Sequence, residues 1–146
     1  MIVLDTSVVL AFMDRRDTDH ELVRIWMGEV EDELVTTPLV LAELDHLASR
    51  YGGPTAADAL RDDFKRGAYS VEWWSSALHD SIAVSERYAT MELGLTDASL
   101  IALADHLKTL EIATFDERHF RAVRPLRARA DAFTLLPADH AASSRP

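Results

Sequence analysis

An isolated carboxylate stands near the start of the chain, in the segment MIVLDTSVVLAFM. Ten of these thirteen residues are apolar, and no Lys, Arg or His lies among them to neutralise Asp5. Burying an unpaired carboxylate is very costly. Asp5 is therefore exposed, protonated, or balanced by a cation that the neighbouring sequence does not supply. The third case would make it part of a metal site.

A second acid follows another short run that is predicted to be a strand. Asp5 comes directly after residues 2–4, and Asp116 comes directly after residues 112–115. Parallel α/β sheets place their ligand sites at the carboxyl ends of the strands. The two acids are therefore expected at one edge of the sheet if the two strands are parallel. The ordinary alternative for each is a turn or helix N-cap aspartate.

Two further acids lie on predicted helices. Glu43 is spaced so as to share a helix face with Leu39 and Leu47, which favours the apolar side of its helix. The alternative is a border glutamate whose long side chain reaches water. Asp97 lies in the first turn of a helix, where an acid commonly satisfies free N–H groups and the helix dipole. If Thr96 is the cap instead, Asp97 lies on the core-facing stripe.

The four acids together favour a cation site. Two carboxylates about 5 Å apart repel by roughly 3 kcal/mol at an effective dielectric constant of about 20. Four converging charges therefore need either protons, with raised and coupled pKa values, or a bound cation. A pocket of oxygen ligands without His or Cys suits Mg²⁺ or Mn²⁺ and not zinc.

The elements that would position these acids alternate along the chain. Short strands separated by helices predict a parallel sheet with crossover helices. The predicted fold class is α/β, a three-layer α/β/α sandwich around a small, mostly parallel sheet of about five strands. Expected strands cover residues 2–4, 34–36, 69–73, 112–115 and 132–136. Expected helices begin at about residue 7 and cover residues 17–31, 38–50, 55–66, 75–93 and 96–110. Residues 1–136 are expected to form one domain, and residues 137–146 a flexible tail.

Composition narrows the class of protein. The formal net charge of −10 argues against nucleic acid as a partner, but five arginines crowd into twelve positions: Arg118, Arg121, Arg124, Arg127 and Arg129. The chain has no cysteine, which excludes disulfides and fits a reducing compartment. No basic stretch precedes the first apolar segment, so we expect no signal peptide. The longest apolar run, residues 8–13, is too short to cross a membrane. We expect a cytoplasmic protein without a membrane partner.

Four segments resemble the signature motifs of PIN-domain ribonucleases, and in particular of the VapC toxins of toxin–antitoxin pairs. They are MIVLDTSVVLAFM, PLVLAEL at residues 38–44, LTDASLIA at residues 95–102 and TFDERHF at residues 114–120. Each motif alone is weak, but all four occur in order over residues 1–136. The resemblance implies a PIN-like sandwich and a Mg²⁺-dependent endoribonuclease, with Mn²⁺ as a possible substitute.

By the same resemblance, the catalytic and metal-binding residues are Asp5, Glu43, Asp97 and Asp116. Asp5 and Asp97 are expected to bind metal directly, Glu43 directly or through water, and Asp116 in the outer sphere. In this family the bound metal holds a phosphate oxygen and activates water, leaving a 5′-phosphate and a 3′-hydroxyl.

Residues around the quartet carry secondary expectations. Thr6 and Ser7 could orient Asp5 through their hydroxyl groups, or simply cap the helix after the strand. His119 is expected to pack at the strand end, with substrate contact as the alternative. Arg118, Arg121 and Arg124 could line the rim of the site and contact RNA phosphates, or form an ordinary solvated surface.

The family also implies partners. These are an RNA substrate, a VapB-like antitoxin with a basic segment, and a second copy of the chain, with the helices of residues 17–31 and 38–66 as candidate dimer surfaces. Alternatives are a PIN-fold nuclease outside a toxin–antitoxin pair and a non-catalytic PIN-fold interaction module. A HAD-type phosphatase is disfavoured because Ser7 stands where a second Asp is required. A phosphoreceiver is disfavoured because Arg118 or His119 stands near the place of its lysine. The sequence assigns neither the RNA target nor a role to Trp73 and Trp74.

Overall fold

The computed structural model describes residues 1–126 and 130–143. Its strands are β1 (Ile2–Leu4), β2 (Leu34–Thr36), β3 (Ser70–Val71), β4 (Glu111–Ala113) and β5 (Thr134–Leu136). Its helices are α1 (Thr6–Met13), α2 (His20–Glu29), α3 (Pro38–Lys65), α4 (Ala77–Arg87), α5 (Leu95–Leu107), α6 (Glu117–Ala122) and α7 (Ala138–Ser143), with a 3₁₀ turn, η1 (Ala89–Met91).

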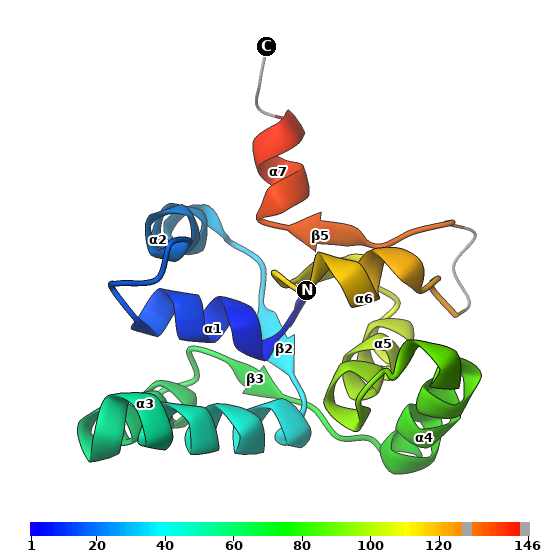
Figure 1. The fold of residues 1–146 in the computed structure, drawn as a ribbon, viewed down its shortest axis with the longest axis horizontal. Coiled ribbons are helices and arrows are strands. Elements are labelled where there is room, and N and C mark those ends of the chain that lie inside the picture. The colour runs from blue at the N-terminus through cyan, green and yellow to red at the C-terminus, as the bar shows by residue number, and fades with distance from the viewer. Residues whose placement is uncertain (127–129, 144–146) are drawn as a thin grey trace.

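The five described strands form one parallel sheet in the order β3-β2-β1-β4-β5. The predicted α/β sandwich is confirmed, and the sheet is entirely parallel where the sequence predicted mostly parallel pairing. Helices α1, α2 and α3 gather on one side of the view in Figure 1 and α4, α5 and α6 on the other, with β2 and β3 seen between them. β1 is the central strand, so the residue that follows it lies in the middle of the sheet edge.

The core explains why these segments fold as they do. Strand residues such as Val3 and Ile112 are fully buried, as expected for parallel strands covered on both faces. The core-facing sides of the helices supply Leu44, Leu60 and Leu103, which are also fully buried. No helix among the described residues is long and apolar enough to span a membrane.

Several boundaries differ from the sequence-based expectation. β4 ends at Ala113, so Asp116 follows the strand by three residues and not directly. The expected helix over residues 75–93 is α4 followed by η1. The expected break near residues 52–54 is a kink at Gly53, whose φ of 73° separates two helical stretches within α3. Glycine adopts this left-handed conformation without a steric penalty.

The C-terminal region is more structured than the sequence predicts. Residues 138–143, expected to lie in a tail, form α7. The Asp139 carboxylate accepts a hydrogen bond from the Leu135 N–H at 2.7 Å and contacts the Arg121 guanidinium at 2.7 Å. These contacts attach the start of α7 to β5 and α6. Residues 144–146 lie outside the described part of the chain.

Candidate active site

Asp5 lies at the carboxyl end of the central strand. Its backbone N–H donates to the carbonyl of Ala113, the last residue of β4, at 3.0 Å, which continues the pairing of β1 with β4 one residue past the end of β1. The residue is only 5% exposed. It occupies the N-cap position of α1, but its side chain makes no capping hydrogen bond. The ordinary alternative of a capping aspartate therefore does not explain Asp5.

Two hydroxyl groups hold the Asp5 carboxylate. Ser7 Oγ donates to Asp5 Oδ2 at 2.6 Å, and Thr114 Oγ1 donates to the same oxygen at 2.8 Å. Burial raises the pKa of Asp5, and these two hydrogen bonds oppose the shift only in part. Ser7 therefore contacts Asp5 as expected. Thr114 was missed because the sequence placed it within the expected strand 112–115, whereas β4 ends at Ala113.

Asp97 faces the same point from the first turn of α5. The cap position of α5 is Gly94, so neither Thr96 nor Asp97 caps the helix as the sequence suggested. The pKa of Asp97 is raised to about 6, first by burial and then by the negative charges of Asp5 and Asp116, against an opposing effect of His119. The side chain therefore lies within the field of two other acids.

Asp116 and His119 complete this cluster. Asp116 caps α6, because its Oδ1 accepts from the His119 N–H at 3.2 Å. The His119 side chain turns back over the same residue, with Nδ1 at 3.0 Å from Asp116 Oδ2 and 3.2 Å from Asp97 Oδ2. The prediction that His119 merely packs at the strand end is wrong, since its ring nitrogen contacts two acids. The prediction of a pocket without histidine is corrected in the same way.

Glu43 is attached to this centre through Thr6. Thr6 Oγ1 donates to Glu43 Oε2 at 2.6 Å. Thr6 is buried and Glu43 is exposed, so of the two interpretations that the sequence left open, the border glutamate that reaches water describes its position. Thr6 was expected to orient Asp5, but its hydroxyl holds Glu43 instead. The structure thus brings Asp97 and Asp116 together with Asp5. Glu43 is linked to this group only through the hydroxyl of Thr6, the residue after Asp5.

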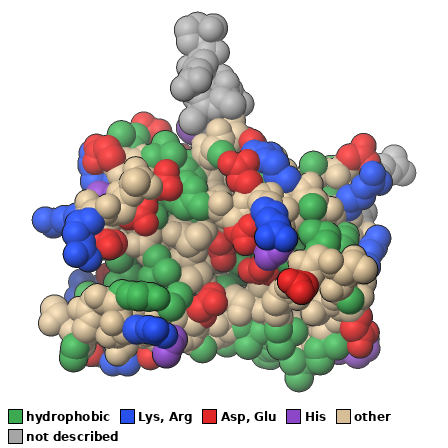
Figure 2. Space-filling model, viewed as in Figure 1, with side chains coloured by type: hydrophobic (Ala, Val, Ile, Leu, Met, Phe, Trp, Pro, Cys, Tyr) green, Lys and Arg blue, Asp and Glu red, His purple; other side chains and the backbone are tan. Residues whose placement is uncertain are grey.

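The arginines after Asp116 do not form one uniform surface. Arg121 is held by two acids, with Nε at 2.5 Å from Glu117 Oε2 and Nη2 at 2.7 Å from Asp139 Oδ1. Arg118 and Arg124 are exposed. Arg127 and Arg129 lie outside the described residues. Acidic side chains gather near the middle of the face in Figure 2, with a basic side chain and a histidine beside them.

The donor set fits a divalent cation. One carboxylate oxygen each from Asp97 and Asp116 and one ring nitrogen of His119 lie within 4.8 Å of one another. Asp5 adds a buried carboxyl group close enough for its negative charge to raise the pKa of Asp97. Carboxylate oxygens in this number suit a hard ion such as Mg²⁺ or Mn²⁺.

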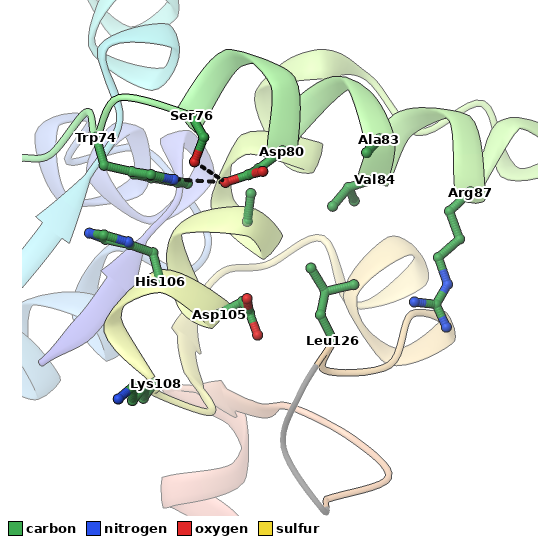
Figure 3. Close-up of a pocket in the computed structure, with 11 residues that line it drawn as sticks. Trp74, Ser76, Asp80, Ala83, Val84, Arg87, Asp105, His106, Lys108 and Leu126 are labelled. Carbon is green, nitrogen blue, oxygen red and sulfur yellow. Dashed lines mark hydrogen bonds between the residues drawn. The ribbon is translucent and has the colours of Figure 1, made fainter.

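A separate cavity lies away from these acids. It measures about 690 Å³ and opens between α4 and α5 (Figure 3), and its described lining includes none of the four predicted acids. At its edge Trp74 donates from Nε1 to Asp80 Oδ2 at 2.8 Å and stacks on His106 with ring centroids 4.4 Å apart. Trp74 therefore ties the segment before α4 to the end of α5.

Comparison with known proteins gives consistent matches. The PIN domain family matches residues 2–125. Ribonuclease VapC26 of Mycobacterium tuberculosis is 33% identical over 137 residues, which is 93% of this chain and 100% of that protein. Ribonuclease VapC44 of the same species is 29% identical over 70% of this chain and 77% of its own length.

Two solved structures share the fold. M. tuberculosis VapC20, described as a sarcin–ricin loop cleaving toxin, superposes with a TM-score of 0.78 at 22% identity and covers 89% of this chain and 100% of its own. FitAcB from Neisseria gonorrhoeae superposes with a TM-score of 0.56 at 17% identity, over 80% and 88% of the two chains.

Proposed function

Because this chain belongs to the PIN-domain family and to its VapC ribonucleases, we propose that it is a metal-dependent endoribonuclease that acts as the toxin of a toxin–antitoxin pair. The observation that carries the proposal is the convergence of acids at the sheet edge. The charges of Asp5 and Asp116 both raise the pKa of Asp97. Asp5 follows β1, Asp97 lies in α5 and Asp116 precedes α6. Three carboxylates brought together from separate elements repel one another unless a cation is bound between them.

Asp97 and Asp116 would hold the ion together with Asp5. Asp5 is kept in place by Ser7 and Thr114 and cannot rotate without breaking both hydrogen bonds. Glu43 is kept at the exposed side of the site by Thr6, where it could orient a water against the substrate. The chemistry that a bound Mg²⁺ or Mn²⁺ supplies there is charge neutralisation of the phosphodiester and activation of water for attack.

Substrate binding would use the exposed arginine next to the cluster. Arg118 lies in α6 one residue before His119 and is exposed. A guanidinium there could bind an RNA phosphate beside the acids. Arg121 is a poor candidate because Glu117 and Asp139 already occupy its donors. RNA binding by this acidic protein would therefore be local, with structured or translation-related RNA as the expected substrate class.

The remaining acidic surface suits a basic antitoxin segment. A second copy of the chain is the other expected partner, and exposed apolar side chains support it. Leu22 and Ile25 of α2 and Tyr51 of α3 lie on the helices expected from the sequence to form that contact, and Leu78 and Ile82 of α4 offer a further apolar surface. An RNA substrate and a protein antitoxin would both be met in the cytoplasm, which is the location that we propose.

The test is cleavage of RNA by the purified protein. We expect cleavage of total RNA with Mg²⁺ or Mn²⁺, none with EDTA, and new ends that carry a 5′-phosphate and a 3′-hydroxyl. Asp5→Asn should abolish cleavage while its circular dichroism spectrum matches that of the unsubstituted protein. Asp58→Asn is the matched control, because it removes an acid of α3 whose side chain is 73% exposed.

The outcome separates the alternatives. Full cleavage by Asp5→Asn would overturn the site assignment. No cleavage by the unsubstituted protein, together with binding of RNA or of a protein partner, would favour the non-catalytic interaction module. Cleavage without any effect of a co-expressed antitoxin would favour a PIN-fold nuclease outside a toxin–antitoxin pair.

A further inference from the structure

His119 is placed where a metal ligand would be. Its Nδ1 lies 3.0 Å from Asp116 Oδ2 and 3.2 Å from Asp97 Oδ2. Ligand atoms about 2.1 Å from an octahedral ion and at right angles to each other are about 3.0 Å apart. The His119 nitrogen therefore already lies at the spacing of a neighbouring ligand from each carboxylate oxygen, and one ligand atom from each of the three residues lies within 4.8 Å of the others.

The backbone around His119 keeps the ring at this point. The His119 N–H is held by the capping Asp116 carboxylate at 3.2 Å. The next residue, Phe120, is fully buried and anchors α6 in the core. His119 is only 20% exposed. The ring is thus presented to the acids by a short helix that is fixed on both sides.

From this geometry we propose that His119 is a nitrogen ligand of the metal site, so that the site holds its ion with mixed oxygen and nitrogen ligands and binds Mn²⁺ more tightly than Mg²⁺. The inference rests on the proposed metal-dependent function and adds a ligand to the acidic quartet. Imidazole is a good ligand for transition-metal ions, whereas Mg²⁺ prefers oxygen ligands and water. One nitrogen ligand among oxygen ligands therefore favours Mn²⁺ over Mg²⁺ by a larger ratio of affinities than a site made of carboxylates alone.

The competing explanation is that His119 only donates a hydrogen bond to the acids and leaves when an ion binds. The two explanations predict opposite effects of removing the ring. A lost ligand weakens Mn²⁺ binding, whereas a lost competitor strengthens the binding of both ions. The experiment can therefore decide between them.

The first measurement is isothermal titration of the full-length protein with Mn²⁺ and with Mg²⁺. We expect His119→Ala to raise the dissociation constant for Mn²⁺ by about 10-fold or more, and that for Mg²⁺ by less than about 3-fold. His79→Ala is the matched control, because His79 also lies beside an acid, at 3.6 Å from Asp80, but its side chain is 88% exposed. It should leave both constants unchanged.

The second measurement needs no variant. Pulsed electron paramagnetic resonance of bound Mn²⁺ should show coupling to a ¹⁴N nucleus, replaced by ¹⁵N coupling in protein grown with ¹⁵N-labelled histidine. No nitrogen coupling, or tighter binding of both ions by His119→Ala, would overturn the proposal. Failure of the proposed function looks different, because the unsubstituted protein would then show neither saturable metal binding nor RNA cleavage.

Discussion

Replacing Asp97 with asparagine should stabilise the metal-free protein. The pKa of Asp97 is raised from an ordinary value of 3.8 to about 6, first by burial and then by the charges of Asp5 and Asp116. Each whole pKa unit corresponds to about 1.4 kcal/mol. Ionised Asp97 therefore lowers the free energy of unfolding by about 2–3 kcal/mol at neutral pH, and Asn removes that cost. Its amide oxygen can still accept from His119 Nδ1.

The sign of the pH dependence follows from the direction of the shift. Because the folded protein holds the Asp97 proton more tightly than the unfolded chain does, this contribution to stability is complete below about pH 4 and is lost as the pH rises through about 6. Asp97→Asn should therefore melt about 5–10 °C above the unsubstituted protein in EDTA at pH 7.5. The difference should nearly vanish at pH 4.

The assay is circular dichroism melting at the two pH values, with Asp58→Asn as the control. Added Mn²⁺ should then raise the melting temperature of the unsubstituted protein, because a ligand that binds only the folded state stabilises it. Asp97→Asn should lose most of that gain. If Asp97→Asn melts at or below the unsubstituted protein in EDTA at pH 7.5, the acids do not repel one another as the structure implies, and the reasoning fails.

Three other substitutions test the parts that support the acids. Thr114→Val removes a donor to buried Asp5 and the acceptor for the Asp116 N–H, so the unfolding free energy in urea should fall by about 2–3 kcal/mol; an unchanged midpoint would contradict this. Thr6→Val releases Glu43 and should slow RNA cleavage, whereas Thr6→Ser should restore it; equal rates for both would remove Thr6 from the site. Arg118→Glu should weaken RNA binding and make it less dependent on salt concentration. Arg121→Gln should leave RNA binding intact and lower the melting temperature, because it loosens the attachment of α7. Weaker RNA binding by Arg121→Gln and unchanged binding by Arg118→Glu would assign the phosphate contact to Arg121.

The sequence was most informative where a charged residue stands at the end of an apolar strand segment. Asp5 could be identified because a charge inside an apolar strand segment has few explanations, and the short strands around it predicted a parallel sheet. Asp116 followed from the same reasoning about the sheet edge, and Asp97 from its place in the first turn of a helix, on the core-facing stripe. The sequence could not establish that these side chains meet at one point, because that depends on how α5 and α6 pack against the sheet.

The missed features depend on tertiary contacts. His119 lies in a helix of six residues, too short for a hydrophobic pattern to show which way its ring points. Thr114 looked like part of a strand, but β4 ends before it and frees its hydroxyl for Asp5. α5 begins at Leu95 although Thr96 is the better capping residue, because burial of Ala98 and Leu100 fixes the helix and outweighs local preference.

A crystal soaked with Mn²⁺ tests the central claim most directly, because anomalous scattering locates the ion without assumptions about its ligands. We predict an Mn²⁺ peak at the sheet edge, bound by Asp5, Asp97 and Asp116 and with His119 Nδ1 in its coordination sphere. A fully occupied peak elsewhere, or acids that remain bare in saturating Mn²⁺ while the crystallised protein still cleaves RNA, would contradict the account.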